Sequence, residues 1–257
     1  MCGFAGCGGY NRTVGLHLYL APHLDDAVFS CGGLIARQSA CGDNVVVMTI
    51  CAGDPPPGQF SLLAQAVHSR WGLGPGAVGA RRAEDRMACG RLGAAVIHLP
   101  LPDSIYRQSP DGTPLYPTEE SMFGSVLDSE GLLVVWATGR IAEACSEEAW
   151  VYCPAAMGGH VDHRLTRAAA ESLGRELWYY SDLPYAARQK GWSEGIVEPT
   201  GVLTTVPLAI EEIQSWADAA VEYRSQISTF WPSNAALMEE LRTYHDRNHG
   251  IRLWAPV

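Results

Sequence analysis

Two short segments of the sequence place histidines and carboxylates close together: PHLDD at residues 22–26 and GGHVDH at residues 158–163. The residues of interest in them are His23, Asp25, Asp26, His160, Asp162 and His163. Buried carboxylates are costly unless a cation or protons compensate their charge. Imidazole with carboxylate is a ligand set that suits Zn²⁺, and three protein ligands leave a fourth position open to water. The segments therefore predict a catalytic metal site, with ligands that suit zinc and iron alike.

Each segment alone also has a structural interpretation. A histidine at the end of a strand is commonly a hydrogen-bonded structural residue, and two aspartates before a helix commonly cap it. The presence of both segments at matching strand ends favours the metal site.

The elements around the two segments place both at one edge of a predicted sheet. Apolar runs predict strands at 15–22, 44–53, 94–103, 149–156 and 176–184, and periodic segments predict helices at 25–42, 79–93 and 163–174. This alternation predicts a mainly parallel sheet covered on both faces, in a Rossmann-like three-layer α/β fold. Ligands of such sheets bind beyond the carboxyl ends of the strands, where both segments emerge.

The length of 257 residues and the 47% hydrophobic content suit a single domain. The alternation ends near Pro184, so we expect residues 1–184 to form the Rossmann-like core. Residues 185–257 then form an extension packed on that core, with a strand and helix at 202–227 and a helix at 234–246. The segment 131–148 is ambiguous, and we expect residues 53–76 to be a loop.

The net charge of −10 and the absence of a Lys/Arg cluster argue against nucleic acid or an anionic membrane as the main partner. No apolar run is long enough for a membrane span, and the N-terminus lacks the features of a secretory signal. The eight cysteines form no CxxC pairs. We therefore expect reduced thiols in a cytoplasmic protein, without stable membrane insertion. The sequence does not predict an oligomeric state.

Two other enzyme classes are disfavoured. The opening MCGFAG resembles the start of class II glutamine amidotransferases, in which Cys2 would be the nucleophile. That resemblance covers six residues, and those enzymes have an antiparallel sandwich rather than the parallel pattern that begins here. A dinucleotide site is excluded because PHLDDA lacks GxGxxG and its carboxylates would repel a pyrophosphate.

The sequence resembles the PIG-L-type (LmbE-like) family of zinc-dependent deacetylases, which remove the acetyl group from N-acetylglucosamine units. The resemblance is carried by the segments around PHLDD and GGHVDH and by several others. APHLDDAVFSCGG and GGHVDH are similar to the family patterns HPDDE and HPDH. The RxxE pattern from Arg81 to Glu84, LPLPD and YYSDLPYA also resemble the family, over most of the chain. YRSQI at 223–227 is similar to a segment of antibiotic-pathway members.

The resemblance implies one Zn²⁺ per chain, held by His23, Asp26 and His163. It also implies roles for Asp25 as general base and His160 as the residue that stabilises the oxyanion or protonates the leaving amine. The remaining implied roles are Asp162 as the orienting partner of His160, and Arg81 and Asp103 as substrate-binding residues.

Two positions depart from the family pattern: Leu24 replaces a proline and Ala27 replaces a glutamate. Neither is a ligand or the base. The missing glutamate leaves open how the metal ligands are supported.

The adjacency of Asp25 and Asp26 lets one carboxylate face the metal and the other face its water. Zinc lowers the pKa of such a water from about 15.7 towards roughly 7. Asp25 could then take the proton as hydroxide attacks the acetyl carbonyl, while zinc and His160 stabilise the oxyanion. Whether Asp25 or His160 protonates the departing amine stays open.

The expected substrate is an N-acetylglucosaminyl unit of a soluble sugar conjugate or natural product, as in the antibiotic-biosynthesis branch. Phe60 and Trp71, in the segment after the second strand, could flank a sugar or simply pack on the domain. The alternatives are an amidase acting on a thiol–sugar conjugate and a non-catalytic sugar-binding module with a vestigial metal site. A two-metal phosphoesterase is disfavoured because no second carboxylate-rich loop is present.

Overall fold

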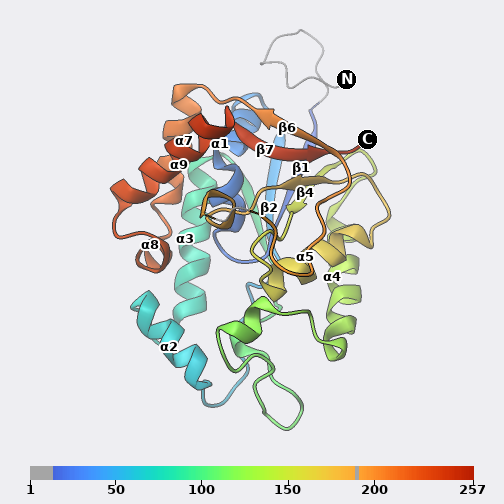
Figure 1. The fold of residues 1–257 in the computed structure, drawn as a ribbon, viewed down its shortest axis with the longest axis vertical. Coiled ribbons are helices and arrows are strands. Elements are labelled where there is room, and N and C mark those ends of the chain that lie inside the picture. The colour runs from blue at the N-terminus through green and yellow to red at the C-terminus, as the bar shows by residue number, and fades with distance from the viewer. Residues whose placement is uncertain (1–13, 189–190) are drawn as a thin grey trace.

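The computed structural model describes residues 14–188 and 191–257. The strands of this part are β1 (Leu16–Ala21), β2 (Asn44–Thr49), β3 (Ala95–His98), β4 (Trp150–Pro154), β5 (Trp178–Tyr180), β6 (Val202–Val206) and β7 (Ile251–Ala255). They form one sheet in the order β3-β2-β1-β4-β5-β7-β6 (Figure 1). The first five strands are parallel, and β7 is antiparallel to both β5 and β6. The mainly parallel sheet confirms the predicted fold class.

The two faces of the sheet bury alternate side chains of the same strand. Tyr19 and Ala21 face a core shared with α1 (Asp26–Ala40), α3 (Ala77–Arg91), α7 (Ile210–Ala220) and α9 (Asn234–Asn248). Leu18 and Leu20 face the opposite core, with α4 (Gly131–Ala144) and α5 (Val161–Glu171). Figure 1 shows these helices on either side of the sheet. The period of two along β1 therefore produces the three layers.

The order in which successive strands are added to the sheet changes direction between β1 and β4, although the two strands are parallel. The strands β2 and β3 follow on one side of β1, whereas β4 and β5 lie on the other. Such a switch point leaves a crevice beyond the carboxyl ends of the two central strands. Residues 22–26 directly follow β1, and residues 158–163 come shortly after β4, so the two segments meet there.

The segment expected to be a loop at 53–76 contains a helix, α2 (Leu62–Trp71). Leu63, Val67 and Trp71 recur every four residues and bury one face of it. The Ser61 side chain accepts a hydrogen bond from the Ala64 amide at 3.1 Å and caps its start. The loop prediction was wrong because prolines and glycines at both ends concealed this short periodic segment.

The extension is more divided than expected. A break follows α7, and α8 (Arg224–Phe230) is a separate helix. The ambiguous segment at 131–148 contains α4, and β7 was not predicted. The other elements are α6 (Tyr185–Arg188) and the short 3₁₀ helices η1 (Ser104–Tyr106), η2 (Glu120–Phe123) and η3 (Asp128–Glu130).

The extension packs closely on the first helix. A Cβ atom added to Gly32 of α1 would lie 2.4 Å from Cδ1 of Trp216 in α7, so only glycine permits this approach. The Trp216 indole donates a hydrogen bond to the Val28 carbonyl at 2.7 Å. The helix that starts at Asp26 is thus braced by a residue of the extension.

Five cysteines, Cys31, Cys51, Cys89, Cys145 and Cys153, are free thiols. The expectation of reduced cysteines is wrong for Cys41, which is disulfide-bonded. Cys2, the nucleophile of the amidotransferase alternative, lies outside the described residues. Among the helices of the described residues, none has the length and apolar character needed to span a membrane.

Candidate metal centre and active site

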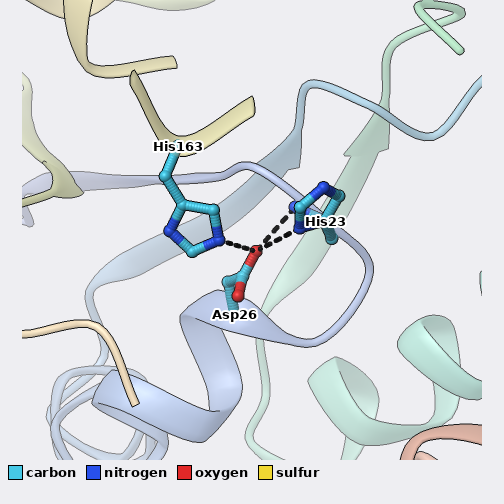
Figure 2. Close-up of side chains that lie close together, drawn as sticks. All are labelled: His23, Asp26 and His163. Carbon is cyan, nitrogen blue, oxygen red and sulfur yellow. Dashed lines mark hydrogen bonds and ion pairs between the residues drawn. The ribbon is translucent and has the colours of Figure 1, made fainter. Parts of the chain in front are cut away.

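The turn after β1 directs His23 and Asp26 towards each other. Pro22 ends the strand, and the Asp25 amide donates to the His23 carbonyl at 2.9 Å. Oδ2 of Asp26 accepts from the His23 amide at 2.8 Å, which closes the turn (Figure 2). Asp25 occupies the N-cap position of α1, yet its side chain makes no capping hydrogen bond. The structural interpretation of Asp25 as a helix cap therefore does not hold.

The turn after β4 brings the second segment to the same place. His160 is the N-cap of α5, and its Nδ1 atom accepts a hydrogen bond from the Asp162 amide at 3.2 Å. His163 lies in the first turn of α5 and points to Asp26 (Figure 2). Residues separated by more than 130 positions are thus joined at the predicted sheet edge.

Three donor atoms lie close enough together to bind one metal ion. Oδ2 of Asp26 lies 3.2 Å from Nδ1 of His23 and 3.4 Å from Nε2 of His163. Two donors that each bind Zn²⁺ at about 2.0–2.1 Å in tetrahedral geometry lie about 3.4 Å apart. The donor atoms of all three residues lie within 4.8 Å of one another. Their chemistry and spacing therefore fit a zinc ion with an open fourth position.

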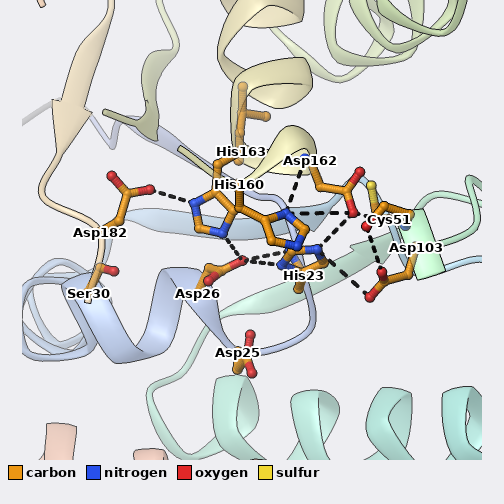
Figure 3. Close-up of polar contacts among 12 residues, drawn as sticks. His23, Asp25, Asp26, Ser30, Cys51, Asp103, His160, Asp162, His163 and Asp182 are labelled. Carbon is orange, nitrogen blue, oxygen red and sulfur yellow. Dashed lines mark hydrogen bonds and ion pairs between the residues drawn. The ribbon is translucent and has the colours of Figure 1, made fainter. Parts of the chain in front are cut away.

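A carboxylate holds the outer nitrogen of each candidate ligand histidine (Figure 3). Nδ1 of His163 lies 2.7 Å from Oδ1 of Asp182, and Nε2 of His23 lies 3.0 Å from Oδ2 of Asp162. Such contacts fix the tautomer and leave the inner nitrogen free to bind a metal. These two carboxylates support the candidate ligands. Ala27, which stands where the family pattern has a glutamate, lies in the apolar core instead.

The position of Asp162 differs from the expectation that it orients His160. Oδ2 of Asp162 is 4.0 Å from Nδ1 of His160, a longer separation than its contact with His23. The same oxygen accepts from the Ser104 amide at 3.0 Å. Asp162 is fully buried behind His23 and does not line the cleft, whereas His160 does.

One guanidinium links the other two predicted carboxylates. The Nη2 atom of Arg81 lies 3.6 Å from Oδ2 of Asp25, and its Nη1 atom lies 3.8 Å from Oδ2 of Asp103. The guanidinium also lies over the ring of Trp71, 4.5 Å from its centroid. Arg81 on α3 therefore connects the candidate base to the candidate substrate-binding carboxylate.

The charges of the site are set by burial and by close partners. Burial raises the pKa of Asp25 to about 7, together with the charge of Asp26 and against the opposing effect of Arg81. Burial lowers the pKa of His160 to about 3, assisted by the cationic forms of His23 and His163. A neutral His160 whose Nδ1 accepts a hydrogen bond must carry its proton on Nε2. The site thus contains a base that titrates near neutrality and a neutral hydrogen-bond donor.

The protonation of His163 shows that its pocket favours a cation. Burial alone would lower its pKa, but the carboxylates of Asp26 and Asp182 together raise it to about 10. A proton therefore occupies a position that a metal ion would take on binding.

The cleft above the candidate metal ligands has a polar floor and largely apolar walls. The floor contains His23, Asp25, Asp26, Arg81, Asp103, His160 and His163. The walls include Trp71 of α2, Met122 and Phe123 of η2, Tyr185 of α6, and Gln226 and Phe230 of α8. Phe60 instead packs against His68 and Tyr106. Of the two predicted aromatic residues, Trp71 alone contributes to the cleft.

Sequence reasoning missed Asp182 and Arg107. Asp182 lies two residues after β5, at the same sheet edge, so its position was a usable signal. The Nη1 atom of Arg107 lies 2.5 Å from Oδ1 of Asp162, a contact that no local pattern indicates.

Comparison with known proteins gives a family match. The pattern of the family described as PIG-L, GlcNAc-PI de-N-acetylase, matches residues 18–173. The 2'-N-acetylparomamine deacetylase of Niallia circulans is 28% identical over 242 residues, which cover 84% of this chain and 82% of that enzyme. The enzyme of the same name from Streptomyces fradiae is 30% identical over 194 residues, with 68% of this chain and 59% of that enzyme covered.

Solved structures of similar proteins share the whole architecture. The zinc-inhibited form of teicoplanin deacetylase Orf2 is 32% identical with a TM-score of 0.79, over 93% of this chain and 97% of that chain. The A40926 pseudoaglycone deacetylase Dbv21 is 29% identical with a TM-score of 0.71, over 93% of this chain and 96% of that chain.

Proposed function

Because the chain belongs to the GlcNAc-PI de-N-acetylase (PIG-L) family, we propose that it is a zinc-dependent deacetylase of an N-acetylglucosaminyl unit in an antibiotic precursor. One observation carries the proposal. Three candidate metal donors, a buried carboxylate that does not cap its helix (Asp25) and a neutral histidine (His160) converge on one cleft at the switch point of the sheet. Each is a group that amide hydrolysis requires.

Zinc bound by His23, Asp26 and His163 would act as a Lewis acid towards the amide and its attacking water. Asp25 receives the proton of that water as the new C–O bond forms. Its pKa of about 7 suits this role because a base near the working pH is partly deprotonated and still accepts a proton readily. The side chain is available because it does not cap α1.

His160 stabilises the oxyanion through Nε2–H. The histidine is neutral over the physiological range, so it donates a hydrogen bond without giving up its proton. Asp25 then returns its proton to the amine nitrogen as the C–N bond breaks. The products are the free amine and acetic acid, which releases its proton to solvent to become acetate, and Asp25 is again a carboxylate.

Arg81 and Asp103 are proposed to bind sugar hydroxyls beside the reacting amide. Both line the cleft, and Asp103 offers a carboxylate 3.8 Å from the Arg81 guanidinium. The aromatic and apolar walls supply surface for a larger group attached to the sugar. The similar teicoplanin and A40926 pseudoaglycone deacetylases support a natural-product substrate. A cytoplasmic location stays a prediction.

The test is acetate release from N-acetylglucosaminyl glycopeptides and from 2'-N-acetylparomamine. We expect product lighter by an acetyl group, loss of turnover with a chelator, and recovery when zinc is returned. Binding of these compounds without acetate release would favour the sugar-binding module. Cleavage of a thiol–sugar conjugate in preference to both would favour the amidase alternative.

A further inference from the structure

A buried arginine lies behind the candidate metal centre and has no role in the chemistry described above. Arg107 follows η1, and its side chain is 5% exposed. Its Nη1 atom lies 2.5 Å from Oδ1 of Asp162, whose other oxygen holds His23. Its Nε atom lies 2.6 Å from Oε1 of Glu130. The arginine therefore joins two buried carboxylates.

The two oxygens of Asp162 have separate partners. Arg107 engages Oδ1, whereas Oδ2 faces Nε2 of His23 and the Ser104 amide, each at 3.0 Å. This division leaves Asp162 little freedom to rotate. Its orientation in turn presents Nδ1 of His23 to Asp26 (Figure 3). The position of a candidate ligand atom thus depends on an arginine that does not touch that ligand.

The opposite side of Arg107 is held by a segment that also forms the cleft wall. Tyr116 donates a hydrogen bond to Glu130, and its ring lies 5.3 Å from the Arg107 guanidinium carbon. Between these two residues lie Met122 and Phe123, which line the cleft. The guanidinium therefore ties the wall segment 116–130 to the support of His23.

We propose that Arg107 is a positioning residue of the metal centre, which sets the orientation of His23 through Asp162. The inference rests on the proposed function, because it assumes that His23 binds the metal. A planar guanidinium suits this task, since one rigid group can form ion pairs with two carboxylates at once, here through Nη1 and Nε at 2.5 and 2.6 Å. A lysine ammonium would keep the charge but lose that geometry.

The test compares the full chain with an Arg107→Lys variant after removal and return of metal. Removal of a group that contacts a ligand directly typically weakens metal binding 10–100-fold. Arg107 acts on His23 only through Asp162, so we expect a loss of Zn²⁺ affinity of about tenfold, the lower end of that range, in competition with a chromophoric chelator. The visible spectrum of the Co²⁺-loaded protein should also change, because it reports the geometry of the ligands. Arg167→Lys is the matched control, since Arg167 lies on the same helix as His163 and bonds the Ala155 carbonyl.

A second variant covers the event that Arg107→Lys does not fold. Arg107→Met with Glu130→Gln removes the cation together with one of its two anions, so the buried net charge is unchanged. We expect it to lose Zn²⁺ affinity as well, while circular dichroism shows a folded chain. Folded variants with the affinity and Co²⁺ spectrum of the unaltered protein would overturn the proposal and leave Arg107 as a tie between segments. An unaltered protein that binds no metal would instead refute the proposed function.

Discussion

Asp182 and Asp26 hold His163 from opposite sides of its imidazole ring. Oδ1 of Asp182 lies 2.7 Å from Nδ1, and Oδ2 of Asp26 lies 3.4 Å from Nε2. The second oxygen of Asp182 accepts from the Met157 amide at 3.0 Å, so the carboxylate is itself fixed. If a metal ion displaces the proton on Nε2, the contact with Asp182 keeps the remaining proton of His163 on Nδ1.

Replacement of Asp182 by alanine should weaken Zn²⁺ binding. The loss of the outer carboxylate frees the ring of His163 and lowers its basicity, and such changes typically cost 10–100-fold in affinity. Competition with a chelator measures the change. Asp246→Ala is a control because the Asp246 side chain is largely exposed on α9. Equal affinities in the two variants would contradict the supporting role of Asp182.

Replacement of Asp25 by asparagine should abolish most turnover and leave metal binding intact. The amide cannot accept the proton of the attacking water, and the loss of a general base typically lowers kcat by about 10²–10⁴-fold. Metal content and kcat are measured on the same preparation. Turnover near that of the unaltered enzyme would reassign the base to another residue.

The rate should fall as the pH decreases through the titration of Asp25. The raised pKa, about 7, means that protonation removes the base already in mildly acidic solution. A metal cation beside Asp26 acts in the same direction as Arg81 and lowers the midpoint, so the acidic limb of kcat/KM should lie at or below about pH 7. The pH profile of Asp25→Asn supplies the comparison, since its residual rate should lack this limb. A limb of equal midpoint in both proteins would show that another group titrates.

Replacement of His160 by alanine should lower kcat by about 10²–10³-fold, the usual cost of one oxyanion donor. Metal affinity should change little, because Asp26 and the two candidate ligand histidines remain. Steady-state kinetics with a single N-acetylglucosaminyl substrate separate kcat from KM. A large loss of zinc with an unchanged kcat per bound metal would make His160 a ligand instead.

Prediction from sequence succeeded where the relevant residues are local. His23 and Asp26 are three positions apart, and the strand that precedes them has an unambiguous apolar pattern. The fold class therefore predicted the edge of the sheet at which these residues lie. Asp162 was expected to orient His160, but its carboxylate lies closer to His23. Proximity to His160 in the sequence does not determine the side of α5 on which that carboxylate lies. The support from Arg107 was not predictable, since it depends on Glu130 and Asp162 meeting inside the protein.

Helix α2 was missed for a different reason. Its apolar spacing is regular, but the helix is ten residues long and is preceded by DPPPG, which favours a loop. Trp71 at its end reaches the cleft only because α2 lies against α8 and the Arg81 side chain. Tertiary packing thus determined a wall of the site that local preference concealed.

The contact of Gly32 with Trp216 joins parts of the chain that are synthesised at different times. The residues PHLDD emerge from the ribosome early, whereas Trp216 follows all three proposed metal ligands. A growing chain that ends before α7 contains every donor atom but lacks the helix that braces the start of α1. We therefore expect metal acquisition during translation to lag behind the appearance of His163 and to await the helices of the extension.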